Sequence, residues 1–188
     1  MRAAIVYFSQ TGKTAAVADA LGAQLDAELI RLTCPAYAGT LGKFRKAWDI
    51  FARGCPSIDL EPLVDGWDLV VVAGPVWDAK AAPPILSALR RLKGKTRRLA
   101  MFVTCDGRVP TSPPETAMEE MVRKWDLPVL TTRIFRRDDI KTAAFTGNVT
   151  SFANELTLLM RLHGRDEAKP APPARLPVNG AAELLLGS

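Results

Sequence analysis

Short runs of apolar residues, separated by longer amphipathic stretches, most constrain how this chain folds. Such runs are too short for a buried helix and lack alternating polar residues, which is typical of strands buried on both faces of a parallel sheet. The clearest runs are Ala3–Phe8, Leu69–Ala73, Leu99–Val103 and, more loosely, Val129–Phe135. A weaker strand is predicted at Ala27–Leu32.

The stretches between these runs place apolar residues at helical spacing, which predicts amphipathic helices. These helices are predicted at Lys13–Gln24, Leu41–Ala52, Pro84–Leu92, Glu115–Trp125 and Val149–Leu162. Strands and helices that alternate strictly predict an α/β fold. We expect an open, doubly wound, five-stranded parallel sheet with helices on both faces and right-handed crossovers.

The length of 188 residues fits one domain with a terminal extension. We predict a domain over residues 1–163 and a proline-rich tail over residues 164–188, with Gly164 as a left-handed cap after His163. No apolar run reaches the ~18 residues of a membrane span. The apolar N-terminal stretch is interpreted as a strand rather than a signal peptide, so we expect a cytoplasmic protein.

Cysteine and histidine are too sparse for a metal centre. The cysteines Cys34, Cys55 and Cys105 are widely spaced, and His163 is the only histidine. This pattern excludes a zinc site of cysteine or cysteine–histidine type and also a disulfide framework. The position of His163 at the end of a helical pattern argues against a catalytic triad. We therefore predict neither a metal ligand nor a catalytic residue.

The most informative loop follows the first strand and has the sequence Ser9-Gln10-Thr11-Gly12-Lys13-Thr14. Backbone N–H groups at such a strand-to-helix turn point into one concavity, where the helix dipole adds positive potential. Hydroxyl groups can add further donors, and Gly12 lets the backbone approach a ligand closely. The loop therefore predicts a phosphate cradle, although an ordinary N-capped helix start is the alternative.

Two Gly-Lys-Thr triplets invite comparison with the P-loop of nucleotide triphosphatases. That motif requires a glycine five residues before the second glycine. Tyr7 occupies this position before Gly12, and Leu89 occupies it before Gly94. Neither loop can wrap a β-phosphate, so triphosphate hydrolysis is excluded.

Taken in order, three loops resemble those of the flavodoxin superfamily. The hydroxyl-x-Thr-Gly-x-Thr pattern at Ser9–Thr14 is similar to its phosphate loop. Gly74–Asp78, followed by Ala82–Pro84, resembles its Gly-x-Pro-x-aromatic loop and Pro-Pro helix start. Thr104–Gly107 is similar to its Thr-x-Gly-Gly loop. The resemblance covers about Met1 to Leu162, and it implies strand order 2-1-3-4-5 and non-covalently bound flavin mononucleotide (FMN) at the carboxyl ends of the strands.

By this resemblance the first loop binds the FMN phosphate and the other two bind the flavin ring. Trp77 is predicted to stack on the isoalloxazine ring, with a core anchor as the alternative, and Thr104–Gly107 to supply backbone donors. The predicted cofactor-binding residues are Ser9, Gln10, Thr11, Gly12, Lys13, Thr14, Pro75, Val76, Trp77, Asp78, Thr104, Cys105, Asp106 and Gly107.

The loops also depart from the usual flavodoxin pattern. Lys13 stands where asparagine is common, and either strengthens phosphate binding or points into solvent. Asp106 replaces a small residue and is either a turn residue or, like Asp78, a charge near flavin N1 that lowers the redox potential. Cys105 is interpreted as a small filler rather than a redox thiol.

The formal net charge of +5 is unusual for a flavodoxin-like electron carrier, since such carriers are usually acidic. The basic run at Arg90–Arg98 is expected on the amino-terminal side of the sheet, and nucleic-acid binding lacks a recognition motif. We expect Arg133, Arg136 and Arg137, with Lys13, near the flavin edge, facing a partner with an acidic or neutral surface.

Three functions are compatible with the sequence. The chain is predicted to transfer electrons through FMN. One alternative is an FMN-dependent reductase that takes hydride from NAD(P)H and reduces a quinone. The other is a flavodoxin-like fold without flavin that acts as an interaction module. The first two would use the same site residues, so the sequence does not separate them.

Overall fold

The computed structural model describes residues 1–52, 54–59, 66–77, 80–106, 119, 121–123 and 129–167. Within these residues, five parallel strands form a sheet in the order β2-β1-β3-β5-β6. They are β1 (Ala3–Tyr7), β2 (Glu28–Arg31), β3 (Leu69–Trp77), β5 (Leu99–Cys105) and β6 (Val129–Arg136). This order confirms the predicted topology. A short strand that was not predicted, β4 (Lys80–Ala81), pairs antiparallel with the end of β3.

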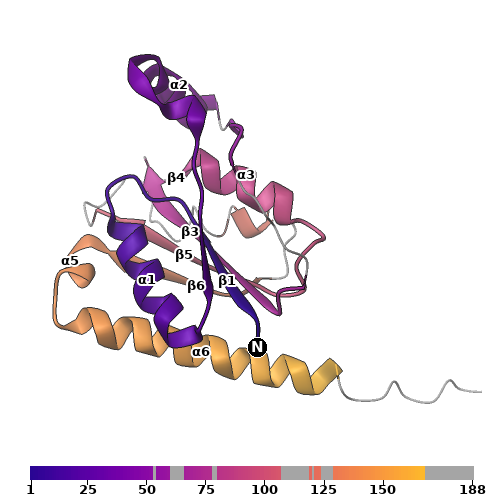
Figure 1. The fold of residues 1–188 in the computed structure, drawn as a ribbon. Coiled ribbons are helices and arrows are strands. Elements are labelled where there is room, and N and C mark those ends of the chain that lie inside the picture. The colour runs from indigo at the N-terminus through magenta and orange to yellow at the C-terminus, as the bar shows by residue number, and fades with distance from the viewer. Residues whose placement is uncertain are drawn as a thin grey trace, which may run out of the picture.

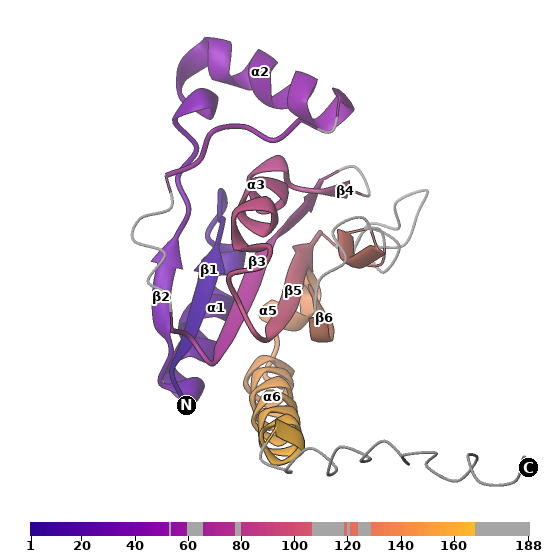
Figure 2. The ribbon, with the colours of Figure 1, turned by 90° about the vertical axis from the view of Figure 1, so that its right-hand side faces the viewer.

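Helices cover both faces of the sheet (Figures 1 and 2). Helices α1 (Lys13–Leu25) and α6 (Ala144–Glu167) pack on one face, and α3 (Pro83–Leu92) packs on the other. The chain also forms a 3-10 turn η1 (Pro35–Tyr37), helix α2 (Gly39–Ala52) and the short α5 (Arg137–Ile140). In Figure 2, α2 lies beyond the upper ends of the strands rather than against either face of the sheet.

One predicted helix end is wrong. Helix α6 continues through Gly164 to Glu167, and Gly164 is not among the residues with positive φ. A glycine inside a helix costs about 1 kcal/mol relative to alanine. The burial of Phe152, Leu156 and Met160 on the same helix can offset this cost. The helix therefore crosses the boundary predicted for the tail, whose residues 168–188 lie outside the described residues.

Two further helix predictions need comment. Helix α6 begins at Ala144, before the predicted Val149. Of the helix predicted at Glu115–Trp125, only residue 119 and residues 121–123 are described, and these are helical. Met121 within this segment is buried in the core on the α3 side.

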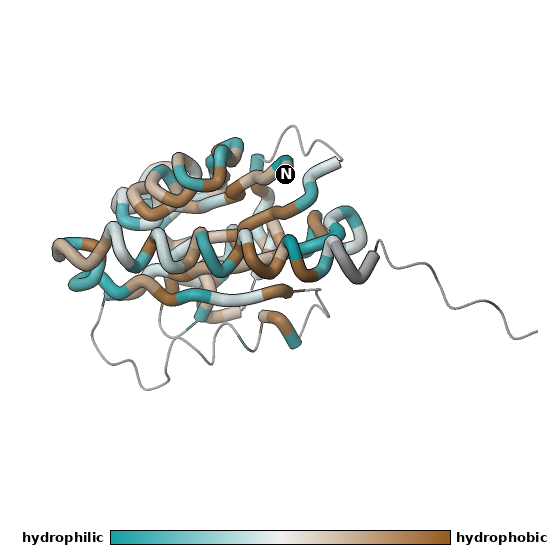
Figure 3. The backbone as a smooth tube through the Cα atoms, turned by 90° about the horizontal axis from the view of Figure 1, so that it is seen from below, coloured by the Kyte–Doolittle hydropathy of each residue, from teal (hydrophilic) through white to brown (hydrophobic). Residues whose placement is uncertain are grey.

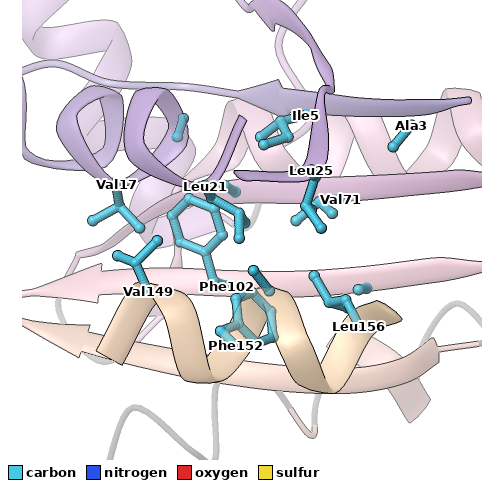
Figure 4. Close-up of a cluster of buried hydrophobic side chains, with 14 of the residues drawn as sticks. Ala3, Ile5, Val17, Leu21, Leu25, Val71, Phe102, Val149, Phe152 and Leu156 are labelled. Carbon is cyan, nitrogen blue, oxygen red and sulfur yellow. The ribbon is translucent and has the colours of Figure 1, made fainter. Parts of the chain in front are cut away.

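The core between the sheet and the α1–α6 layer is built from aliphatic and aromatic side chains (Figure 4). Phe102 of β5 and Phe152 of α6 meet with ring centroids 6.5 Å apart, and both contact Phe135 of β6 at 5.6 and 6.2 Å. All three pairs are T-shaped, a geometry worth about 0.5–1.5 kcal/mol per pair beyond area burial. Figure 3 views the molecule from the side of α6 and shows hydrophobic and hydrophilic residues alternating along this helix. The apolar residues of α6 thus close the core.

The parallel strands set the position of the site. Because β1, β3 and β5 run in the same direction, their carboxyl ends share one edge of the sheet. The same edge lies beneath α2 in Figure 2. Among the described helices, none combines the length and apolar character that a membrane crossing requires.

Candidate functional site

The sheet register brings the predicted loops together. Tyr7 at the end of β1 pairs with Ala73 of β3, and Pro75 of β3 pairs with Thr104 of β5. The N–H of Phe8 donates to the carbonyl oxygen of Ala73 at 3.0 Å, which continues the pairing into the first loop. The described parts of all three loops therefore leave neighbouring strands at one edge. Asp78 and Gly107 lie outside the described residues.

The first loop forms an open helix N-terminus. Gly12 is the N-cap of α1 and has φ +84°, a left-handed conformation that favours glycine. A Cβ built on Gly12 would meet no atom within 4 Å, so open space lies beside this residue. The first turn of α1 carries no acidic side chain to neutralise the helix dipole. This arrangement suits an anion bound by backbone N–H groups.

The polar side chains of the loop have different surroundings. Ser9 is buried, and its Oγ accepts a hydrogen bond from the N–H of Ala15 at 3.2 Å. Gln10 and Thr11 are exposed at the mouth of the loop. Ser9 therefore shapes the helix start, whereas Thr11 is left in contact with solvent.

Thr14 links the first loop to the third. Its hydroxyl oxygen lies 2.8 Å from that of Thr104 at the end of β5, and both residues are only 2% exposed. The pair fixes the start of α1 against β5. Thr14 as a phosphate donor stays a prediction, but the structure assigns it a positioning contact that the sequence pattern did not indicate.

Lys13 and Asp106 form an ion pair across the same two loops. Lys13 is half-buried and Asp106 is exposed. Lys13 thus does not simply point into solvent, and Asp106 is more than a turn residue. Because opposite charges offset each other at a distance, Asp106 would perturb a nearby flavin less than a lone carboxylate would. Cys105, next to it, is half-buried.

Trp77, at the end of β3, is half-buried between two neighbours. Phe8 meets its ring edge-on, with centroids 5.7 Å apart at 83°. The ammonium of Lys46, from α2, lies 5.1 Å from the ring centroid, which is a cation–π contact. Trp77 is therefore anchored on one side by the core and meets a charged group on another. Its stacking on flavin stays a prediction.

Lys46 also reaches the first loop, because its Nζ donates to Oε1 of Gln10 at 3.3 Å. Beside this contact lies a cavity of about 390 Å³, within the usual size range of small-molecule sites. The cavity is lined by Gln10, Tyr37, Gly39, Thr40, Gly42, Lys43 and Lys46. The lysines of α2 were not predicted to belong to the site, because this helix was predicted from its apolar spacing alone. The sequence signal that could have identified them is the spacing of Lys43 and Lys46, which lie three residues apart and therefore on one side of the helix.

A tight contact with η1 holds α2 in place. A Cβ on Gly42 would lie only 2.8 Å from Cα of Tyr37, so the helix can approach the turn this closely only with glycine. The carboxylate of Asp49 is buried and accepts from Nε of Arg45 at 3.1 Å. Burial raises the pKa of the Tyr37 phenol, and the charge of Asp49 raises it further. Tyr37 is therefore a neutral wall of the cavity at any physiological pH.

The predicted arginine cluster is divided by the structure. Arg133 donates to Oε2 of Glu155 on α6 at 2.5 Å and lies 5.4 Å from the Phe152 ring centroid, so its charge is bound to α6. Arg136, the last residue of β6, and Arg137, the first residue of α5, are exposed. Burial acts to raise the pKa of Glu155, but hydrogen bonds from Thr131 and Arg133 outweigh it, and the net pKa is lowered.

The described residues contain no group of three or more His, Cys, Asp or Glu side chains that could hold a metal ion.

No protein-family model and no curated protein matches the chain. Solved structures do. A protein from Bacteroides eggerthii that has been assigned as a flavoprotein aligns with a TM-score of 0.62 at 22% identity, over 81% of this chain and 96% of its own.

Two further structures match over most of their length. The Lactobacillus acidophilus flavoprotein in complex with FMN aligns with a TM-score of 0.58 at 21% identity, over 73% of this chain and 94% of its own. Oxidised flavodoxin 2 from Bacillus cereus aligns with a TM-score of 0.50 at 17% identity, over 84% of this chain and 99% of its own. The fold of this chain is that of the flavodoxin-like proteins.

Proposed function

We propose that this chain binds FMN non-covalently at the carboxyl edge of its sheet and uses it to transfer electrons. The observation that carries the proposal is the open, Gly12-capped N-terminus of α1, which has no acidic side chain in its first turn. It stands beside Trp77 and Thr104 in a flavodoxin-like fold. The similar Lactobacillus acidophilus flavoprotein, which is a complex with FMN, adds support.

Each part of the site would have its own task. The N-terminus of α1 and the Thr11 hydroxyl would hold the terminal phosphate, and Ser9 would keep the loop in shape. Trp77 would give the ring an aromatic surface, and Thr104–Asp106 would offer polar groups to its edge. When bound, FMN would supply the redox chemistry. The proposal includes a cytoplasmic location, in keeping with cysteines that are free among the described residues.

The first test is the cofactor itself. The purified chain should be yellow or turn yellow with added FMN, and it should bind FMN more tightly than riboflavin. Thr11→Glu should weaken FMN binding sharply because it places a negative charge beside the phosphate. Thr11→Gln is the matched neutral control. Equal affinity for riboflavin and FMN would show that Ser9–Thr14 is only a helix cap, and the proposal would fail.

A reductase is the second candidate, and the cavity beside Gln10 favours it. The cavity carries two lysines, Lys43 and Lys46, next to the proposed phosphate site, which suits an anionic nucleotide such as a nicotinamide donor. Anaerobic mixing with NADH or NADPH separates the two functions. A reductase should lose its flavin colour within seconds, and Lys43→Ala should slow that reduction. A simple carrier should keep its colour.

For a carrier, we propose a partner with an acidic or neutral surface. The support is the net charge of +5 and the exposed Arg136 and Arg137 at the carboxyl end of β6. Electron-transfer rates with an acidic partner should fall as salt rises, because screening shortens to ~8 Å at physiological ionic strength. Arg136→Glu and Arg137→Glu should slow transfer at low salt. Rates insensitive to both salt and charge reversal would contradict this.

A further inference from the structure

Helix α2 carries an apolar face that the other described residues leave exposed. Leu41, Phe44, Trp48 and Phe51 are 84%, 73%, 64% and 78% exposed. We call these four side chains the α2 stripe. Monomeric proteins rarely expose contiguous apolar patches beyond a few hundred Å². With about 150–250 Å² for each aromatic side chain, the α2 stripe exposes roughly 500 Å² and is a candidate interface.

The α2 stripe faces away from the contacts that hold the helix. Gly42 and Asp49 are the buried residues of α2, and Lys46 turns toward Gln10 and Trp77. At 3.6 residues per turn, these three positions lie on the side of the helix opposite the α2 stripe. As long as α2 keeps these contacts, the α2 stripe remains exposed. It is therefore available to a second molecule.

The spacing within the α2 stripe indicates what kind of surface fits it. The apolar residues follow one another at intervals of three, four and three, as positions a and d do in a helix–helix seam. The residues that flank this seam are small and uncharged at Thr40, Ala47 and Ala52. Such flanks let another helix approach closely.

Most charged residues of α2 lie away from this seam. Arg45 is the one charged residue beside the seam, and it is paired with Asp49. A membrane-surface helix would instead place cations along the border of its apolar face. The flanks therefore favour a protein helix over an anionic lipid surface.

We propose that the α2 stripe binds the α2 stripe of a second copy of this chain, with the two helices antiparallel. This pairing places Leu41 opposite Phe51 of the other copy, and Phe44 opposite Trp48. The contact is two-fold symmetric and closed, so assembly stops at the dimer. Two stripes bury about 1,000 Å² together, the lower limit for a specific interface, so the dimer is reversible. The proposal does not depend on flavin binding.

Sedimentation velocity of the full chain over a concentration series tests the dimer. We expect a monomer–dimer equilibrium that is unchanged or strengthened by added salt, because the contact is apolar and each copy is positively charged. Phe44→Glu should leave only monomer. Leu158→Glu, on the exposed side of α6, is the matched control and should keep the dimer. Circular dichroism must show that both variants are folded.

The opposite results overturn the proposal. These are a monomer throughout the series, equal loss of dimer in both variants, or a dimer that salt dissociates. Sedimentation with vesicles of anionic phosphatidylglycerol that Phe44→Glu abolishes, without any dimer in solution, would assign the α2 stripe to a membrane instead.

Engineered cysteines test the antiparallel orientation. Ala47 lies near the two-fold axis, so Ala47→Cys in a Cys55→Ser background should form a disulfide-linked dimer on mild oxidation. Leu41 lies at one end of the seam, about 15 Å along the axis from its own copy in an antiparallel pair. Leu41→Cys should therefore remain unlinked. A disulfide at position 41 and none at position 47 would indicate a parallel pair and contradict the proposed arrangement.

Discussion

Phe152 of α6 and the aromatic residues of α2 lie at helical spacing in their own helices but have opposite surroundings. Phe102, Phe135 and Phe152 are at most 1% exposed and pack edge to face. Phe44 and Phe51 of α2 lie at regular helical spacing, yet most of their surface is in water. Apolar periodicity thus identifies a face that needs a partner, while the arrangement of the other elements decides whether that partner lies within the same chain.

The largest expected difference is in stability. Phe152→Ala removes a ring from the three-phenylalanine cluster, and we expect it to lower the free energy of unfolding by about 3–5 kcal/mol. Phe51→Ala, in the α2 stripe, should change it by no more than about 0.5 kcal/mol in the monomer. Urea unfolding at a concentration too low for self-association measures both. Similar losses would mean that the α2 stripe is covered in the monomer.

The contact between α2 and η1 can be disrupted by a substitution that leaves the core unchanged. Gly42→Ala forces a Cβ against the backbone of Tyr37, and such overpacking typically costs about 1–3 kcal/mol. We expect faster hydrogen exchange in α2, with exchange in β1 and β3 unchanged. Gly147→Ala in α6 is the matched control, because its Cβ meets no atom within 4 Å, and it should stabilise the fold by about 0.5–1 kcal/mol. Unchanged exchange in the Gly42 variant would show that η1 yields easily.

Within the candidate site, the buried Thr14 and the exposed Thr11 are expected to affect stability and FMN binding differently. Thr14→Val leaves the Thr104 hydroxyl buried without its partner, so the unfolding free energy should fall by about 1–3 kcal/mol. Thr11→Val affects an exposed residue and should leave stability within about 0.5 kcal/mol. In FMN titrations the order of the two effects should be reversed, because Thr11→Val should weaken FMN binding directly. If Thr14→Val proves as stable as the parent chain, the hydroxyl pair has no positioning role.

The smallest effect is expected from acid. The pKa of Glu155 is lowered in the folded chain, so its bonds to Thr131 and Arg133 stabilise the fold above the unfolded-state pKa, near 4.5. That contribution should disappear as the pH falls below this value. In urea unfolding from pH 7 to pH 3.5, Glu155→Gln should therefore lose less stability than the parent chain. Parallel pH profiles would contradict the assignment.

The fold was largely predictable because its strands have an unambiguous signature. β1, β3 and β5 are nearly continuous apolar runs, and both faces of each are buried. β4 was missed because two residues carry no periodicity, and its pairing exists only where the chain turns back on β3. The cap at Gly164 was wrong because local glycine preference was outweighed within a long packed helix.

The site was predictable only as a set of loops. Chain order and the parallel direction of the strands placed Ser9–Thr14, Trp77 and Thr104 at one edge. Which side chains would touch was not predictable. Lys13 contacts Asp106, and Thr14 contacts Thr104, across about 90 residues of sequence. Lys46 reaches Trp77 from a helix that had been assigned no ligand contact.

The amino-acid sequence by itself determined where the five parallel strands and the longer helices form, because those depend on local periodicity and on the burial it implies. It also determined which loops carry donors and small residues. The tertiary structure decided the pairing of hydroxyls and charges between loops, the cavity beside Gln10 and the outward direction of the α2 stripe. Those features depend on distances between segments far apart in the chain, which no local pattern of residues encodes.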